Sequence, residues 1–300
     1  MKRFPQLAIG GAAAVFGVAG LLAWLAGQEL TKRPAPDAYA NPTQFGLSYE
    51  PVVFSSRDGV TLRGWFIPAG ESRSTVIICP GHSGSMHSDL KDAPWFHEAG
   101  YNLFMFDWRG RGLSDGAVTS LGILERRDLL GAIDFLSERD IERVGLMGFS
   151  MGGAVAMATS PMTEAVAVVV SDGGFSRVQD VVAGGLVRQR GMPPAIARLA
   201  SRPIIWAASL QLGVDITLID PIRWADFFRA PLLMIHGQRD PFVSPWAAYQ
   251  LYHAAREPKE LWMVPEAGHR DIQQLRQREY RERVLGFFTR WLDGSVATPG

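Results

Sequence analysis

A serine with the setting of a nucleophile lies near the middle of the chain. Residues 148–152 read Gly-Phe-Ser-Met-Gly and directly follow the apolar run Val144 to Met147. A serine held in a sharp turn between a strand and a helix exposes its hydroxyl, and the positive end of the helix dipole points at it. The same spacing also arises by chance in glycine-rich turns, so the motif alone is weak evidence. Its strand-turn-helix context favours Ser150 as a nucleophile.

A serine hydroxyl needs a base to take its proton, and the base needs an acid to orient it. His269 and Asp240 each follow a short apolar run that is typical of a buried strand. Open sheets of parallel strands build their sites at the carboxyl ends of the strands, so both loops are expected near Ser150. Asp172 also follows a strand and is a rival acid. We expect Ser150, Asp240 and His269 to be the catalytic residues.

Two backbone amides are expected to stabilise the negative charge that develops on the attacked oxygen. One is the N–H of Met151, directly after the nucleophile, and the other comes from the loop Pro80 to Ser85 after an earlier strand. Within that loop we choose the N–H of His82. Removing one such donor typically costs about 2.7 to 4 kcal/mol of transition-state stabilisation.

From Leu47 onward, short apolar runs alternate with helical patterns, which predicts an α/β fold with a mostly parallel sheet between helices. An Asp-Gly turn at Arg57 to Gly59 predicts a hairpin before the parallel part. Helices are expected over Leu121 to Leu136 and Gln274 to Leu292. The 54 residues from Ser176 to Arg229 exceed what a usual crossover needs and indicate an inserted helical cap. Its three expected helices are Val178 to Val187, Pro193 to Leu199 and Ile204 to Leu212.

From about Tyr49 to Leu292 the chain resembles the α/β-hydrolases, in the branch of monoacylglycerol-lipase-like and serine-aminopeptidase-like proteins. Four motifs carry the resemblance, in the family's order: residues 148–152, 107–114, 236–240 and 268–269. The resemblance implies an α/β-hydrolase fold and a Ser-His-Asp triad that works without a cofactor. The oxyanion loop departs from the family pattern, because it begins Pro80-Gly81 where His-Gly is usual.

The first residues favour a membrane segment. Between Arg3 and Glu29 there is no charge, and Leu7 to Gly27 is an apolar run whose helical length, roughly 30 Å, equals the hydrocarbon thickness of a bilayer. We expect a transmembrane signal anchor; a cleaved signal peptide and a buried helix are the alternatives. Lys2 and Arg3 place the following domain on the extracytoplasmic side, where cleavage would leave it secreted or periplasmic.

Composition excludes other classes of protein. With 30 basic and 30 acidic residues among 300, no excess charge favours nucleic acid as a partner. A single cysteine and six scattered histidines exclude a disulfide framework and give a metal site little support. The expected organisation is an anchor over 1–33 with its transmembrane helix at about 7–27, a linker over 34–46, a hydrolase core over 47–175 and 230–293, the cap over 176–229 and a tail over 294–300.

Three functions fit these residues. The first is a membrane-tethered serine esterase acting on a small or lipid-like ester through a covalent acyl-enzyme. The second is peptidase or thioesterase action by the same triad. The third is a non-catalytic, anchored binding module that keeps the fold. The sequence identifies neither the natural substrate nor the oligomeric state.

Overall fold

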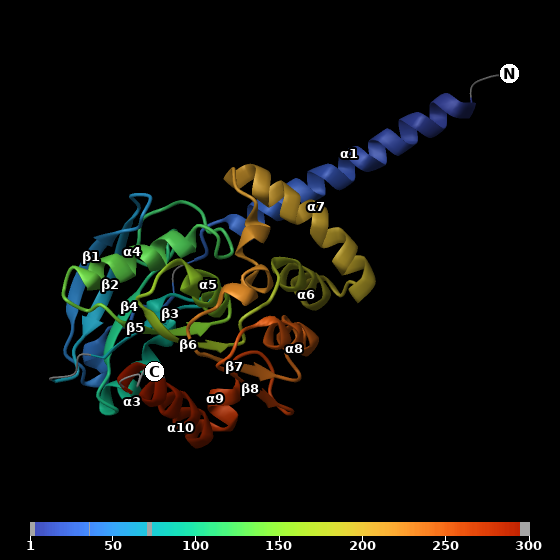
Figure 1. Ribbon diagram of the computed structural model, residues 1–300. Coiled ribbons are helices and arrows are strands. Elements are labelled where there is room, and N and C mark those ends of the chain that lie inside the picture. The colour runs from blue at the N-terminus through green and yellow to red at the C-terminus, as the bar shows by residue number, and fades with distance from the viewer. Residues whose placement is uncertain (1–3, 36, 71–73, 295–300) are drawn as a thin grey trace.

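The computed structural model describes residues 4–35, 37–70 and 74–294, with side chains described from residue 17 onward. Its centre is an eight-stranded sheet in the order β1-β2-β4-β3-β5-β6-β7-β8 (Figure 1). β2 is antiparallel to both β1 and β4, and the remaining neighbours are parallel. The strands are β1 Glu50–Ser55, β2 Thr61–Ile67, β3 Thr75–Cys79, β4 Asn102–Phe106, β5 Val144–Phe149, β6 Val166–Asp172, β7 Leu232–Gly237 and β8 Lys259–Val264.

The uninterrupted apolar runs form the inner strands, as expected, except Leu261 to Val264, which lies in the partly buried edge strand β8. Every residue of β3, β4, β5, β6 and β7 is buried, because helices cover both faces of the sheet. The Asp-Gly turn joins the outer pair β1 and β2, with Gly59 at a positive φ of 85°. The prediction of a mostly parallel sheet flanked by helices is confirmed.

Two layers of helices enclose the sheet (Figure 1). Residues of α4, α5 and α8 pack into the apolar cluster on one face, and residues of α2, α3, α9 and α10 pack into the cluster on the other. The helices are α1 Phe4–Thr31, α2 Met86–Asp89, α3 Ala93–Glu98, α4 Glu125–Ser137, α5 Met151–Thr159, α6 Val178–Arg190, α7 Pro194–Leu212, α8 Pro245–Ala254, α9 Ile272–Leu275 and α10 Gln277–Phe288.

Two predicted helices outside the cap have different bounds in the structure. α4 begins four residues later than expected, because Leu121 and Gly122 have positive φ angles that a right-handed helix excludes. The predicted helix Gln274 to Leu292 is interrupted at Arg276, whose φ of −130° separates α9 from α10. It ends in a π-helical turn, Thr289–Asp293.

Residues 176–229 contain α6, α7 and three short 3₁₀ turns. The two helices expected over Pro193 to Leu199 and Ile204 to Leu212 are a single helix, α7, which continues through Pro203. A proline inside a helix removes one backbone hydrogen bond, and this loss predicted a break. Packing of α7 against both α1 and α6 stabilises the continuous helix across that position.

The predicted transmembrane helix is not found. Over the part of the chain that the structure describes, no helix combines the length and the apolar character needed to cross a membrane. The first ten residues of the predicted span, 7–16, have side chains outside the described set. The last turns of α1 instead contact protein, since Ala23, Gly27 and Thr31 are buried.

The described residues of the segment 34–46, expected as a linker, lie against the hydrolase body. The Asp37 carboxylate accepts hydrogen bonds from the backbone N–H and the hydroxyl of Ser85 at 2.8 and 2.9 Å. The Ala40 carbonyl lies 2.6 Å from Nδ1 of His87. These contacts attach the segment to the loop that follows β3.

Candidate active site

Ser150 occupies the turn between β5 and α5. β5 ends at Phe149, α5 begins at Met151, and Ser150 between them has a φ of 52° and a ψ of −114°. A residue with a side chain rarely adopts a positive φ, so the surrounding structure must impose this strain. The backbone N–H of Ser150 donates to the Asp172 carbonyl at 2.8 Å, which ties the turn to β6.

A side chain at position 148 or 152, on either side of Ser150, would clash with the neighbouring backbone, so both positions need glycine. A Cβ atom on Gly152 would lie 2.0 Å from the carbonyl oxygen of Cys79, at the end of β3. A Cβ atom on Gly148 would lie 2.6 Å from the carbonyl oxygen of Gly152. The spacing of residues 148–152 therefore follows from how tightly the turn packs on its neighbours.

The structure brings Ser150, His269 and Asp240 together. The Oγ of Ser150 lies 3.0 Å from Nε2 of His269, and Nδ1 of His269 lies 2.6 Å from Oδ2 of Asp240. β5, β7 and β8 are parallel, so the loops after their carboxyl ends meet at one edge of the sheet. This explains how residues 119 positions apart form one hydrogen-bonded line.

Asp240 is buried and already has partners besides the histidine. Its Oδ1 accepts the backbone N–H groups of Phe242 and Val243 at 2.8 and 2.9 Å, which leaves Oδ2 for His269. Burial acts to raise the pKa of Asp240, but the hydrogen bond and charge of His269 and these two amides outweigh it. The pKa of Asp240 is therefore lowered, and the group is a carboxylate at neutral pH.

Asp172, the rival acid, has a different partner. Its Oδ2 accepts the hydroxyl of Tyr280 at 2.9 Å. Burial raises its pKa to about 6, and the nearby Arg270 and Tyr280 offset only part of that effect. The carboxylate that hydrogen-bonds His269 is therefore that of Asp240 and not that of Asp172.

The two predicted oxyanion donors flank the serine. Met151 is the first residue of α5, and the first amides of a helix have no acceptor within it. The loop carrying His82 passes the nucleophile, because a Cβ atom on Gly81 would lie 3.5 Å from Cβ of Ser150. Among the described residues, neither the Met151 nor the His82 amide has a backbone acceptor. Their role as oxyanion donors stays a prediction.

The side chain of His82 has a role that the sequence did not indicate. It lines the same cavity as Leu30, at the end of α1, and its Nε2 is buried without a hydrogen-bond partner among the described residues. Burial, with the charge of Arg111, lowers the pKa of His82 to about 4, so the imidazole is neutral at physiological pH. No local sequence signal connects His82 and Leu30, because they lie 52 positions apart in the chain.

A chamber of about 410 Å³ opens above Ser150 and His269. Its walls come from the end of α1, the loop after β3, the cap helices α6 and α7, and the loop that follows Asp240. Most of the lining is apolar, as is usual for a small-molecule site of this size. The sequence indicated apolar cap residues here but missed the contribution of α1, because its apolar run was interpreted as a membrane segment.

Among the residues that the structure describes, no cluster of three or more histidine, cysteine or carboxylate side chains has an arrangement that could hold a metal ion. Cys79, at the end of β3, is buried as a free thiol whose pKa burial raises.

Comparison with known proteins supports the same fold. Residues 76–284 match the family model described as "Alpha/beta hydrolase family". The chain is 31% identical over 250 residues to the uncharacterized protein YfhR of Escherichia coli O157:H7, covering 80% of each chain. It is 24% identical to the polyketide transferase ATR5 of Stachybotrys chlorohalonatus, over 80% of this chain and 99% of that protein.

Solved structures are similar over most of the chain. The esterase Pf2001 of Pyrococcus furiosus superposes with a TM-score of 0.75 at 25% identity, covering 87% of this chain and 98% of its own. The α/β-hydrolase GrgF of Penicillium sp. sh18 superposes with a TM-score of 0.65 at 22% identity, over 83% of this chain and all of that one. The second likeness is one of fold.

Proposed function

We propose that this chain, which belongs to the alpha/beta hydrolase family, is a serine esterase that cleaves carboxylic esters of small or lipid-like molecules. The observation that carries the proposal is His269, whose two ring nitrogens lie within hydrogen-bonding distance of Ser150 and Asp240 on the floor of an apolar chamber. The likeness to the Pyrococcus furiosus esterase supports ester hydrolysis as the reaction.

In the first half of the proposed reaction, Oγ of Ser150 attacks the ester carbonyl carbon while Nε2 of His269 takes the hydroxyl proton. The carbonyl electron pair moves onto oxygen, where the amides of Met151 and His82 stabilise the charge. Collapse of this intermediate breaks the ester C–O bond, and the leaving alkoxide takes the proton from His269. The acyl group stays on Ser150.

In the second half, a water molecule gives a proton to His269 and attacks the acyl carbon. The second tetrahedral intermediate collapses, Oγ of Ser150 recovers the proton, and the carboxylic acid leaves. Asp240 remains a carboxylate throughout, because its lowered pKa suits an ion that orients the imidazole and stabilises its charged form. No cofactor takes part in these steps.

The decisive experiment is the substitution Ser150→Ala, assayed with p-nitrophenyl esters and with a fluorophosphonate probe. We expect kcat to fall by about 10⁴-fold or more and labelling to disappear, because the nucleophile is lost. Unchanged hydrolysis by the variant would remove Ser150 from the mechanism. A wild-type protein that neither labels nor hydrolyses would instead favour a non-catalytic binding module.

A panel of matched esters, thioesters and aminoacyl amides distinguishes the esterase from the thioesterase and peptidase alternatives by relative kcat/KM.

The narrower likeness to monoacylglycerol-lipase-like and serine-aminopeptidase-like proteins stays a prediction. So does an extracytoplasmic location with attachment to a membrane through the N-terminal segment. The exposed apolar side chains Val18, Leu21 and Leu22 of α1 motivate that attachment.

A further inference from the structure

The end of α1 forms part of the chamber that contains the reactive serine. Ala26, Glu29 and Leu30 line the same cavity as Ser150 and His269. These three residues belong to the helix whose sequence favours a membrane segment. The C-terminal turn of this helix is therefore placed where a bound substrate would touch it.

Close packing holds α1 against the cap. The two helices α1 and α7 lie side by side (Figure 1), and a Cβ atom on Gly27 would come within 2.9 Å of the backbone N of Ala208. The side-chain amide of Gln211 donates to the Trp24 carbonyl at 2.9 Å. Helices that approach this closely interlock through backbone and small side chains, so α1 has a defined position beside the chamber.

The other side of α1 is attached to the hydrolase body. The Thr31 carbonyl accepts the backbone N–H of Thr119 at 2.9 Å, and the guanidinium of Arg33 donates to the Gly112 carbonyl at 2.9 Å. His82, in the oxyanion loop, lines the same cavity as Leu30 of α1. α1 therefore bridges the cap and the hydrolase body.

The chamber is apolar inside and polar where it meets solvent. The lining residues Leu30 of α1, Val182 of α6 and Ile204 of α7 are buried or half-buried, whereas Glu29 and Arg190 are exposed. The Glu29 carboxylate pairs with Lys32 at 2.6 Å. An interior without a fixed charge suits an apolar chain or ring, and the charged groups at its rim remain hydrated.

We propose that the chamber binds the acyl group of the substrate and that α1 is the wall that sets the acyl length it accepts. This inference rests on the proposed ester hydrolysis, since it names the part of the substrate that the chamber takes. Ala26 and Leu30 are specificity-determining residues that act by volume. Neither contacts the reacting atoms, so changing them alters which ester is preferred and leaves the catalytic line intact.

The test compares kcat/KM for p-nitrophenyl octanoate with that for the butyrate, using the full chain. We expect Ala26→Phe to lower the octanoate-to-butyrate ratio at least tenfold, because the ring takes space from the chain and each excluded methylene is worth about fourfold. We expect Leu30→Ala to raise the same ratio severalfold. Leu25→Phe is the matched control, because Leu25 is 51% exposed on the same helix and lies outside the chamber lining.

Fluorophosphonates with short and long alkyl chains give a second readout that needs no turnover. Their relative labelling rates should shift in the same directions as the ester ratios. Ratios within twofold of wild type in both Ala26→Phe and Leu30→Ala, with labelling intact, would overturn the role of α1 while leaving the esterase proposal standing. Failure of the wild-type protein to label would overturn both, and opposite shifts in the two chamber variants with none in the control would support the inference.

Discussion

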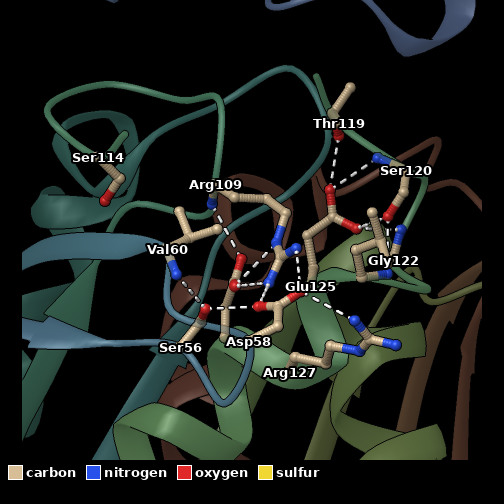
Figure 2. A network of polar contacts seen from close by, with 12 residues as sticks. Ser56, Asp58, Val60, Arg109, Ser114, Thr119, Ser120, Gly122, Glu125 and Arg127 are labelled. Atoms are coloured by element: carbon tan, nitrogen blue, oxygen red, sulfur yellow. Dashed lines mark hydrogen bonds and ion pairs between the residues drawn. The ribbon is translucent and has the colours of Figure 1, made fainter. Parts of the chain in front are cut away.

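Two clusters of buried charge lie near the active-site edge of the sheet, and they differ in how completely their polar atoms are satisfied. In the first, Arg109 bonds the carboxylates of Asp58 and Asp128 through all three side-chain nitrogens, at 2.5 to 2.9 Å. Figure 2 shows the guanidinium of Arg109 beside Asp58, with Glu125 and Arg127 nearby. The neighbouring Glu125 accepts hydrogen bonds from four donors of the loop before it.

The second cluster surrounds Arg270, the residue after His269. Its guanidinium pairs with Asp89 at 2.6 Å and stacks over the ring of Phe149, 4.2 Å from the centroid. Four of the cluster's buried polar atoms have no partner among the described residues: Nε of Arg270 and one carboxylate oxygen each of Asp89, Asp92 and Asp172. Both clusters are therefore buried, but only the first is fully hydrogen-bonded.

The difference in hydrogen bonding predicts how each cluster affects the stability of the fold. A fully paired cluster resists the loss of any member, because removing one charge leaves another buried without a partner. The Arg109 cluster joins the hairpin turn before β2 to the loop after β4 and to α4. Buried charged groups without hydrogen-bond partners instead destabilise the fold, and here the cluster includes Arg270, the residue after the proposed base His269. We therefore expect that neutralising a charge in the first cluster lowers the free energy of unfolding of the protein. Neutralising a charge in the second cluster is expected to raise it.

The largest effect is expected from Arg109→Met in the paired cluster. The substitution leaves the buried Asp128 without its ion-pair partner and Asp58 with only the half-exposed Arg127, which should lower the free energy of unfolding by about 3 to 5 kcal/mol. At present the hydrogen bonds from Arg109 hold the pKa of Asp58 well below its ordinary value. Urea unfolding followed by circular dichroism measures the change; a loss under about 1 kcal/mol would show that the pairing contributes little.

A smaller effect of opposite sign is expected from Asp172→Asn in the incomplete cluster. The pKa of Asp172 is about 6 in the folded chain against an ordinary 3.8, so the folded state holds the proton more tightly and loses stability as pH rises between these values. The asparagine cannot ionise, and its carbonyl can still accept the Tyr280 hydroxyl. The variant should therefore become more stable than wild type above pH 6, by at most about 3 kcal/mol.

Thermal unfolding of Asp172→Asn and wild type at pH 4, 5, 6 and 7 checks this prediction. The difference in Tm should grow in favour of the variant from pH 4 to pH 6 and then level off. A difference that stays constant with pH would contradict the raised pKa, because a purely structural effect of the amide has no reason to follow that titration.

The smallest effect is expected from Arg127→Ala, which serves as the matched control for Arg109. Arg127 bonds the same Asp58 carboxylate at 3.0 Å, but its side chain is 52% exposed. Water and salt screen such a pair, so its loss should cost less than about 1 kcal/mol in the same urea experiment. A cost comparable to that of Arg109→Met would mean that burial does not distinguish the two cations.

The sequence was sufficient for most of the fold because its signals are local. The uninterrupted apolar runs predicted the inner strands, and the Asp-Gly turn predicted the outer hairpin. The failures came where a local signal competes with packing. Pro203 predicted a helix break that contact with two neighbouring helices overrides, and Leu121 was placed in a helix although its backbone turns the opposite way.

By itself, the sequence determined which residues could act as a serine nucleophile, a base and an acid. Their types, their order and their positions after predicted strands are all local properties of the chain. The tertiary structure decided what those residues touch: that Asp240 and not Asp172 meets His269, and that Leu30 of α1 lines the chamber. Whether an apolar helix or a buried carboxylate meets lipid, water or protein depends on surfaces contributed by distant segments, and only folding brings those segments together.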